Sequence, residues 1–369
     1  MNKTSSSFSV QWNHRIFFTS DAFDKSSPLN AAIEELSPLK ILAVIDKGIA
    51  EANSEYIDKF LNWCNSNELV VPKPLLVRGG EETKNDLKSV EEVIERVQTD
   101  RICRKSCILV LGGGAVLDAV GFAASIAHRG IPLIRMPSTT LSQGDSGVGV
   151  KNGVNYFGKK NFIGVFDPPF AVINDVTLLS SLENIHWRSG LSEAIKVALV
   201  KDRKLFDFIE EHAGALNERS IKEMQYALEQ SALLHLNHIT QGGDPFEKKL
   251  ARPLDFGHWA AHKLEQLSNY QLSHGDAVAI GLCIDVQCSV VLGHLDQSVA
   301  KRIITLLKKL GFPIYHQLCE QPELIEGIQE FREHLGGKLT LLMLKGIEST
   351  FDIHVLEPAV VRQAIANLR

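Results

Sequence analysis

Five short apolar runs in the first half of the chain alternate with helix-length segments, and this alternation constrains the fold more than any other feature. Runs without a polar residue at every second position are typical of strands buried on both faces of a parallel sheet. The β-α-β order predicts a doubly wound, Rossmann-like α/β sheet. The predicted strands are residues 41–45, 75–77, 107–111, 132–136 and 171–173, and helical patterns at 54–64, 86–98 and 115–127 lie between the first four.

The second half differs, because long amphipathic helical patterns replace the alternation after about residue 176. With 369 residues the chain is long enough for two domains. We therefore expect an α/β domain at residues 1–176 and an all-α domain at residues 177–369, with a ligand site in the cleft between them. The helical patterns cover residues 188–200, 203–212, 218–236, 256–267, 275–292 and 296–310.

Composition argues against several functional classes. The net charge is −5, from 39 basic and 44 acidic residues, and no cluster of Lys and Arg stands out, so no nucleic acid is expected as a partner. No uninterrupted apolar run reaches about 18 residues, so no membrane span is expected. The six cysteines form no CxxC pair, and the first residues lack the apolar core of a signal peptide. We expect free thiols and a cytoplasmic protein.

The glycine run Gly112–Gly114 follows a predicted strand and enters a helix. Glycines in this position let backbone N–H groups approach a pyrophosphate at a helix N-terminus, so the run suggests a dinucleotide site. Because position 117 is Leu, the strict GxGxxG pattern is absent, and a tight structural turn explains the run equally well. Asp46 at another strand end could accept from a ribose hydroxyl or simply cap a helix.

One carboxylate and several histidines have spacings that suit a metal. Glu193 lies three residues before Lys196 on one helical face, and His258 lies four before His262 on another. Together with His274 they form a Glu/His/His set, typical of a catalytic zinc site with one open position. The alternative is that each histidine is a core or capping residue. A second helical pair, His235 and His238, has a similar spacing, and spacing alone does not choose between the pairs.

A third cluster is the glycine-rich segment 145–155, which is followed by residues 158–161. Its Lys and Asn side chains are donors that suit a phosphorylated or polyhydroxylated ligand. A solvated loop with charged tips is the alternative interpretation.

Taken together and in this order, the segments resemble those of the 3-dehydroquinate synthases and the wider superfamily of sugar phosphate cyclases. The resemblance extends over most of the chain. The matching segments are Gly80–Lys84, Gly112–Asp118, His128–Gly130, Pro137–Thr139, Asp145–Asn155, Lys160–Asn161, Gly190–Lys196, Phe256–His258, His262 and His274–Ala279.

The resemblance implies an NAD-binding α/β domain, a helical metal domain with Zn²⁺ or Co²⁺, and a homodimer. It implies metal ligands at Glu193, His258 and His274, and sets His235 and His238 aside. It implies NAD contacts at Asp46, Glu81, Lys84, Gly113, Gly114, Asp118, Ser138, Thr139 and Lys160. It implies substrate contacts at Asp145, Lys151, Asn161, Lys196, Asp255 and His262, and an Arg129 that reaches the phosphate pocket of a neighbouring subunit.

The reaction of the superfamily uses the cofactor, metal and side chains that the resemblance implies. NAD transiently oxidises a secondary alcohol of a sugar phosphate, and a Lewis-acidic metal polarises that oxygen. The new carbonyl acidifies the adjacent C–H, and phosphate leaves by β-elimination. The substrate's own phosphate can take the proton, so a dedicated base is not needed. NADH then returns the hydride, and an intramolecular aldol reaction closes a carbocycle.

Departures from the 3-dehydroquinate synthase pattern concern the substrate. Asn237 stands where these enzymes carry a lysine, and Arg252 lies near the place of an arginine; both family cations are associated with a substrate carboxylate. Asp255 replaces an asparagine, as in relatives that cyclise sedoheptulose 7-phosphate. Asn152 replaces a threonine after the loop lysine. Glu333–Gly337 occupies the region of a missing Asp-Lys-Lys, where His334 is a candidate replacement for a phosphate-side lysine.

These departures favour a sedoheptulose 7-phosphate cyclase that makes a valiolone-type C7 cyclitol, of the 2-epi-valiolone synthase-like type. His262 speaks against the 2-epi-5-epi-valiolone synthases, which usually have proline there. One alternative is a 3-dehydroquinate synthase acting on 3-deoxy-arabino-heptulosonate 7-phosphate. Others are a metal-dependent polyol dehydrogenase with net NADH production and a binding module without activity.

Overall fold

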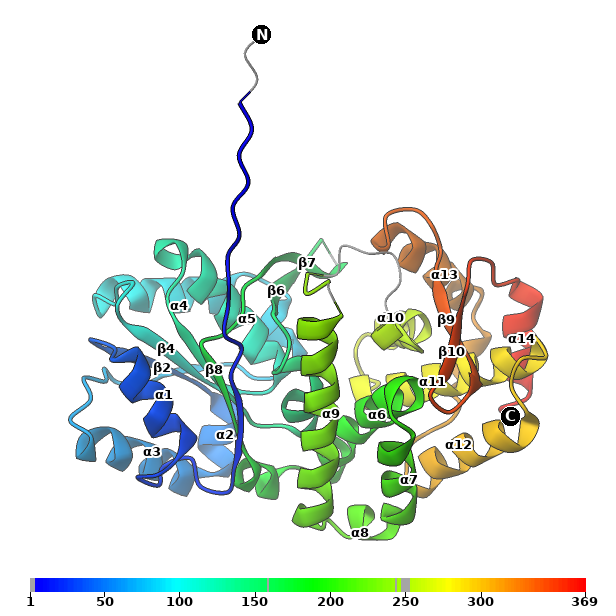
Figure 1. Ribbon diagram of the computed structural model, residues 1–369, viewed down its shortest axis with the longest axis horizontal. Coiled ribbons are helices and arrows are strands. Elements are labelled where there is room, and N and C mark those ends of the chain that lie inside the picture. Colours follow the sequence, from blue (N-terminus) through cyan, green and yellow to red (C-terminus); the bar gives the residue numbers. More distant parts are fainter. Residues whose placement is uncertain (1–3, 158, 243, 247–252) are drawn as a thin grey trace.

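The computed structural model describes residues 4–157, 159–242, 244–246 and 253–369. Its first half is built around a six-stranded parallel sheet with the strand order β1-β8-β5-β4-β2-β3 (Figure 1). The doubly wound α/β prediction is therefore confirmed. The strands are β1 (Ile16–Thr19), β2 (Ile41–Asp46), β3 (Leu75–Val77), β4 (Cys107–Gly112), β5 (Leu133–Pro137) and β8 (Ala171–Asp175).

Both faces of this sheet are buried, which explains the unbroken apolar runs. Along β2, Ile41, Ala43 and Ile45 belong to one core cluster, whereas Leu42 and Val44 belong to the other. The first cluster includes residues of α1 (Pro28–Leu36) and α3 (Ser54–Ser66). The second includes residues of α4 (Lys88–Thr99) and α5 (Gly114–Ile126). Helices therefore cover the sheet on both sides, and the carboxyl ends of its strands meet at one edge.

Two features of this half were not predicted. The edge strand β1 pairs with β8 in parallel, although its four residues gave no separate signal. The glycine-rich segment predicted as a loop is largely an antiparallel hairpin, β6 (Lys151–Tyr156) and β7 (Lys159–Phe166). Gly153 and Gly164 face each other across it, and a Cβ atom on Gly153 would lie 2.6 Å from the Ile163 carbonyl oxygen. The hairpin therefore depends on close backbone contact rather than on an apolar pattern.

The second half is mainly helical, as predicted, and has a core of its own. It also contains a small antiparallel hairpin, β9 (Leu341–Gly346) and β10 (Ser349–Ile353), so it is not composed of helices alone. Its helices are α6 (Asn184–Lys201), α7 (Arg203–Glu211), α8 (Ala213–Asn217), α9 (Ile221–Gln241), α10 (His258–Leu267), α11 (His274–Val291), α12 (Gln297–Lys309), α13 (Pro322–His334) and α14 (Pro358–Ala366).

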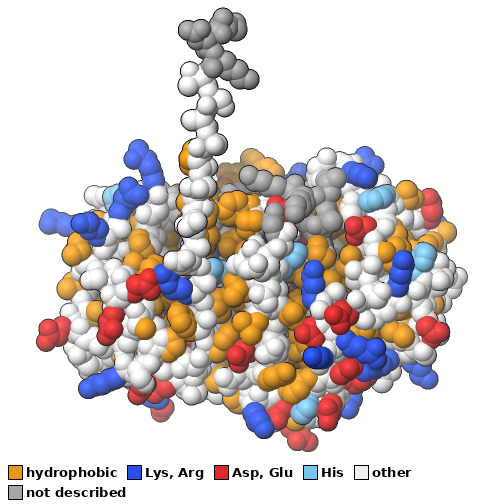
Figure 2. All heavy atoms as spheres, viewed as in Figure 1, with side chains coloured by type: hydrophobic (Ala, Val, Ile, Leu, Met, Phe, Trp, Pro, Cys, Tyr) orange, Lys and Arg blue, Asp and Glu red, His pale blue; other side chains and the backbone are white. Residues whose placement is uncertain are grey.

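In Figure 1, helix α9 lies between the sheet and the other helices of the second half. Among the described residues, α11 alone is long and apolar enough to cross a membrane by length and composition, with a mean hydropathy of 1.3. However, 83% of that stretch is buried in the protein, where α11 packs against α6, α10 and α14. It therefore serves as a central core helix. Basic and acidic side chains are interspersed over the face shown in Figure 2.

Candidate active site

Three side chains from three helices converge on one point in the second half. Glu193 comes from the middle of α6 and is fully buried, whereas His258 and His274 are the first residues of α10 and α11. The Nε2 atoms of His258 and His274 lie 3.4 and 3.3 Å from Glu193 Oε1. One ligand atom from each residue falls within 4.8 Å of the others. The structure thus brings together the three residues that the sequence resemblance assigns to a metal.

The other nitrogen of each histidine ring has a partner that orients the ring. His258 Nδ1 donates to the Phe256 carbonyl oxygen at 3.2 Å, and His274 Nδ1 donates to Glu265 Oε2 at 3.1 Å. Both Nε2 atoms therefore face Glu193. Metal-binding histidines are typically held in this way. One carboxylate and two imidazoles also fit Zn²⁺ with a position left for another ligand.

Glu265, which is 3% exposed, was not predicted from the sequence as a site residue. A signal was present, because His258, His262 and Glu265 follow one another at intervals of four and three on one face of α10. Glu265 also accepts from Lys160 Nζ at 2.8 Å, and Lys160 lies 3.9 Å from Glu81 Oε1. Lys160 is on β7, so this contact links the hairpin of the first half to a histidine of the second.

Lys196 keeps the Glu193 carboxylate charged. It is 3% exposed and forms an ion pair with Glu193 one turn earlier on α6. Burial alone would raise the pKa of Glu193, but Lys196 and His258 outweigh it and hold the pKa well below its usual value. Burial would lower the pKa of Lys196, but Glu193 and Asp145 raise it. Both groups are therefore ionised at neutral pH.

His262 lies beside the triad, with its ring centroid 5.2 Å from that of His258 and 6.2 Å from that of His274. Burial lowers its pKa well below the usual value, and the charge of Lys160 lowers it further. The imidazole is therefore neutral at pH 7, with one ring nitrogen that donates a hydrogen bond and one that accepts.

Asp145 approaches the triad from the α/β half, on the π-helical turn Ser142–Ser146 that follows β5. Burial would raise its pKa, but Lys196 and His235 together outweigh burial and the pKa is lowered. His235 on α9 contacts Asp145 Oδ1 through Nδ1. The structure thus gives His235 a partner in the site, and that partner is Asp145 rather than the triad.

The residues predicted to hold NAD lie at or near the carboxyl edge of the sheet. Asp46 ends β2, and hydrogen bonding from the Gly48 and Gly113 backbone N–H groups opposes the rise that burial causes in its pKa. Gly113 and Gly114 begin α5, and a Cβ atom on Gly114 would lie 2.6 Å from Ser146 Oγ. Ser138 and Thr139 directly follow β5. This edge combines a helix N-terminus with a carboxylate, as dinucleotide sites require.

Lys84 is a buried cation close to this edge. It donates to Asp118 Oδ2 at 2.7 Å and also to Asn161 Oδ1. Asn161 has a positive φ of 53° and donates its backbone N–H to Asn155 at 2.8 Å. The predicted NAD residues Lys84 and Asp118 are therefore joined directly to the predicted substrate residue Asn161.

Three predicted substrate residues are more open. Lys151 begins β6 with an exposed side chain, and Asp255 is half-buried near the charge of Lys196. Arg129 is exposed and forms no ion pair with any described residue. It has a φ of 64° and follows His128 with a φ of 52°, so two consecutive residues other than glycine adopt the left-handed region. Arg252 and the side chain of His334 lie outside the described part of the chain.

The Asn152 side chain is hydrogen-bonded within the protein, although its place in the sequence relates it to the choice of substrate. It is 4% exposed, accepts from Arg135 Nη2 at 2.7 Å and donates to the Asp167 carbonyl oxygen at 3.0 Å. Arg135 is fully buried and also donates to the carbonyl oxygens of Gly147, Gly149 and Lys151. Asn152 is thus one of four neutral acceptors that hold this guanidinium under the segment before β6.

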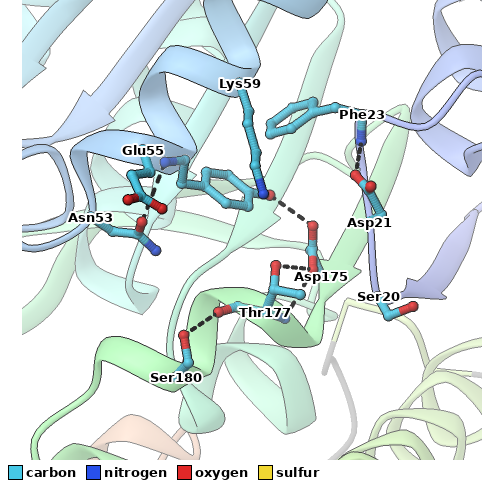
Figure 3. Close-up of a pocket in the computed structure, with 10 residues that line it drawn as sticks. Ser20, Asp21, Phe23, Asn53, Glu55, Lys59, Asp175, Thr177 and Ser180 are labelled. Atoms are coloured by element: carbon cyan, nitrogen blue, oxygen red, sulfur yellow. Dashed lines mark hydrogen bonds between the residues drawn. The ribbon is translucent and has the colours of Figure 1, made fainter.

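A cavity of about 220 Å³ lies elsewhere along the sheet edge, near β1 and β8 (Figure 3). Asp175 lines it and accepts from the Tyr56 hydroxyl at 3.0 Å and from the Ala22 backbone N–H at 2.9 Å. No residue of the Glu193 triad lines this cavity. The bonds to Asp175 fasten α3 and the segment after β1 to the end of β8.

Comparison with known proteins identifies the family. The model of the 3-dehydroquinate synthase N-terminal region matches residues 74–189, and that of the C-terminal region matches residues 190–332. The chain belongs to the 3-dehydroquinate synthase family. The resemblance noted in the sequence is therefore confirmed, and the family is one of sugar phosphate cyclases.

Similar proteins within this family differ in their products. A 2-epi-valiolone synthase of Actinosynnema mirum is 30% identical over 355 residues, covering 94% of this chain and 90% of that protein. A 3-dehydroquinate synthase of Acidithiobacillus ferrooxidans is 31% identical over 331 residues, covering 89% of each. The solved structure of a 2-epi-5-epi-valiolone synthase from Streptomyces hygroscopicus subsp. jinggangensis, with NAD⁺ and Zn²⁺ bound, has a TM-score of 0.91 and 26% identity over 99% of each chain.

A 2-deoxy-scyllo-inosose synthase, whose structure holds NAD⁺ and Co²⁺, shares the fold with a TM-score of 0.81 at 22% identity, covering 95% of this chain and 96% of that chain. The dehydroquinate synthase-like fold is thus confirmed.

Proposed function

We propose that this protein is an NAD- and metal-dependent sugar phosphate cyclase that converts sedoheptulose 7-phosphate to a valiolone-type C7 cyclitol. The observation that carries the proposal is the orientation of the triad. Both histidines turn Nε2 toward Glu193 Oε1 while Nδ1 is hydrogen-bonded elsewhere. This arrangement supports a catalytic metal site rather than two core histidines.

The cofactors follow from the same residues. Glu193, His258 and His274 would hold Zn²⁺ or Co²⁺, which polarises the reacting oxygen when bound. The sheet edge at Asp46, Gly113 and Gly114 would hold NAD, which supplies and recovers the hydride. Glu81, Lys84, Asp118, Ser138, Thr139 and Lys160 complete the proposed cofactor set. Solved relatives with NAD⁺ and Zn²⁺ or Co²⁺ bound support this assignment.

The side chains around the triad have roles that match their charges. Lys196, ionised and buried, would stabilise negative charge on the substrate oxygen beside Glu193. His262, neutral at pH 7, would hydrogen-bond a substrate hydroxyl. Asp145, held by His235, would orient a hydroxyl. Asp255, near Lys196, would contact the same end of the substrate.

Lys151 and Asn161 on the hairpin would bind the phosphate group. We further propose a homodimer in which the exposed Arg129 completes the phosphate pocket of the neighbouring subunit, and a domain boundary near residue 176.

The choice of substrate rests on the carboxylate that sedoheptulose 7-phosphate lacks. A buried carboxylate requires cationic partners. Asn237, on α9 two residues after His235, stands where 3-dehydroquinate synthases have a lysine. An identity of 31% with a 3-dehydroquinate synthase keeps that reaction as the second candidate.

Phosphate release tests both candidates together. Purified protein is loaded with zinc and NAD and given sedoheptulose 7-phosphate or 3-deoxy-arabino-heptulosonate 7-phosphate, and NADH absorbance is followed in parallel. A cyclase releases phosphate without accumulating NADH, because the hydride returns to the product. Accumulation of NADH without phosphate release would instead indicate a polyol dehydrogenase. The variant Glu193→Gln serves as the control for metal dependence.

A further inference from the structure

A carboxylate lies in the apolar core behind the triad, and nothing in the proposed reaction uses it. Asp285 is in the middle of α11 and is 1% exposed. It forms no ion pair with any described residue. Burying a carboxylate without a cationic partner costs folding free energy, so we expect the hydrogen bonds of Asp285 to have a role.

Both oxygens of Asp285 accept from residues that flank the metal ligand His258. Oδ2 accepts from the Gly257 backbone N–H at 2.8 Å, and Oδ1 accepts from Trp259 Nε1 at 2.8 Å. Asp285 is thus hydrogen-bonded to the residue before His258 and to the residue after it. It does not touch His258 itself.

The peptide group between Phe256 and Gly257 connects Asp285 to the imidazole. Its N–H donates to Asp285, and its carbonyl oxygen accepts from His258 Nδ1 at 3.2 Å. Because a peptide group is planar, fixing the direction of its N–H also fixes that of its C=O. A hydrogen-bond acceptor on the N–H also polarises the carbonyl and strengthens it as an acceptor.

The backbone around Gly257 is closely packed, so the Gly257 N–H has little freedom to turn to another acceptor in place of Asp285. Gly257 has a φ of 79°, and a Cβ atom on it would lie 2.8 Å from the Leu282 backbone nitrogen. A Cβ atom on Gly281 would lie 2.1 Å from the Gly257 carbonyl oxygen. The turn before α10 therefore rests directly on α11, one turn before Asp285.

We propose that Asp285 is a positioning residue for the metal site, which orients His258 through the Phe256–Gly257 peptide group. The two histidines of the triad are then both supported by a buried carboxylate, His274 directly by Glu265 and His258 through one peptide group by Asp285. The inference rests on the metal site of the proposed function.

The test is the affinity for Zn²⁺, measured by competition with a chromophoric chelator, together with the ligand-field spectrum of the Co²⁺ form. Asp285→Leu removes both acceptors, and we expect a loss of zinc affinity of about tenfold, at the low end of the range for groups that support metal ligands. We also expect a changed Co²⁺ spectrum. Ser289→Ala is the matched control, because Ser289 is buried one turn later on α11 and its hydroxyl accepts from the Leu344 backbone N–H at 3.2 Å. The hydroxyl also donates to the backbone carbonyl oxygen of Asp285 at 2.8 Å, so the variant leaves the Asp285 carboxylate in place. It should lower stability and leave zinc affinity within about twofold.

Asp285→Asn keeps the volume of the side chain and adds a sharper test. Its single carbonyl oxygen cannot serve two donors, so the NH₂ group faces either Gly257 N–H or the Trp259 indole. Adding Trp259→Phe removes one donor and frees the amide oxygen for Gly257. We expect the double variant to bind zinc more tightly than Asp285→Asn alone.

Two results would overturn the proposal. One is a zinc affinity and Co²⁺ spectrum in both Asp285 variants that equal those of the unmodified protein. The other is a double variant whose loss of zinc affinity is the sum of the two single losses, as a packing role predicts. Failure of the unmodified protein to bind zinc would instead refute the metal site of the proposed function.

Discussion

The two sides of the candidate site are built differently. On the metal side, Glu193, His258 and His274 come from helices of the core, and each ring nitrogen has a partner. On the substrate side, Lys151, Asn161 and Arg129 are exposed and come from a hairpin and a turn, two of them with positive φ. In the proposed function, the metal is therefore held by the helical core, whereas the phosphate group is bound by surface segments, which tolerate change.

The largest expected effect comes from removing the buried lysine that pairs with the Glu193 carboxylate. Lys196→Met leaves the fully buried Glu193 without its cation, and we expect the metal-free protein to lose about 3–5 kcal/mol of unfolding free energy. Zinc should restore part of this loss, because the ion replaces the missing charge. Chemical unfolding with zinc and with a chelator measures both quantities.

The matched control is Lys263→Met, which breaks the pair with the half-exposed Glu330. We expect a loss of less than about 1 kcal/mol there, with or without zinc. Equal losses in the two variants would contradict the view that the metal side depends on buried charge.

A smaller effect is expected when the change is in the hydrogen-bond partner of a proposed metal ligand. Glu265→Gln removes the anionic acceptor of His274 Nδ1, and zinc affinity should fall by about 10–100-fold. Competition with a chelator measures the affinity. A zinc affinity unchanged in Glu265→Gln would show that the hydrogen bond to His274 has no role in metal binding.

The smallest effect concerns the segment that carries Lys151. Asn152→Thr removes one of the four acceptors of Arg135, and we expect a loss of about 1–2 kcal/mol in stability. The preference between the two sugar phosphates should not change, because the Asn152 amide faces Arg135 and the Asp167 carbonyl. The ratio of kcat/KM for the two substrates checks this. A switched preference would make Asn152 a specificity residue after all.

Sequence patterns predicted the architecture well where burial is strong. The five apolar runs coincide with β2, β3, β4, β5 and β8 to within a few residues, since strands buried on both faces have no polar interruptions. The hairpin β6–β7 was missed because its glycines and polar residues signal a loop. The short edge strand β1 gave no distinct signal, and the β9–β10 hairpin lies after residue 310, where the last predicted helical pattern ends.

Only part of the candidate site could be predicted from the sequence. The metal ligands lie in recognisable motifs, but their partners lie far along the chain or depend on side-chain direction. The contact of His235 with Asp145 spans 90 residues, and that of Lys160 with Glu265 spans 105. Asn152 was related to substrate because it replaces a threonine of the family pattern after the loop lysine, and in the structure its amide points to the buried Arg135. Adjacent residues of a strand face opposite sides, so the Asn152 side chain does not point the same way as that of Lys151.

The most direct test of the proposed function is phosphate release from sedoheptulose 7-phosphate by the zinc- and NAD-loaded protein. We predict stoichiometric release of phosphate and a cyclic C7 product without accumulation of NADH, and loss of both in Glu193→Gln. Release from 3-deoxy-arabino-heptulosonate 7-phosphate alone would contradict the proposed substrate and identify a 3-dehydroquinate synthase.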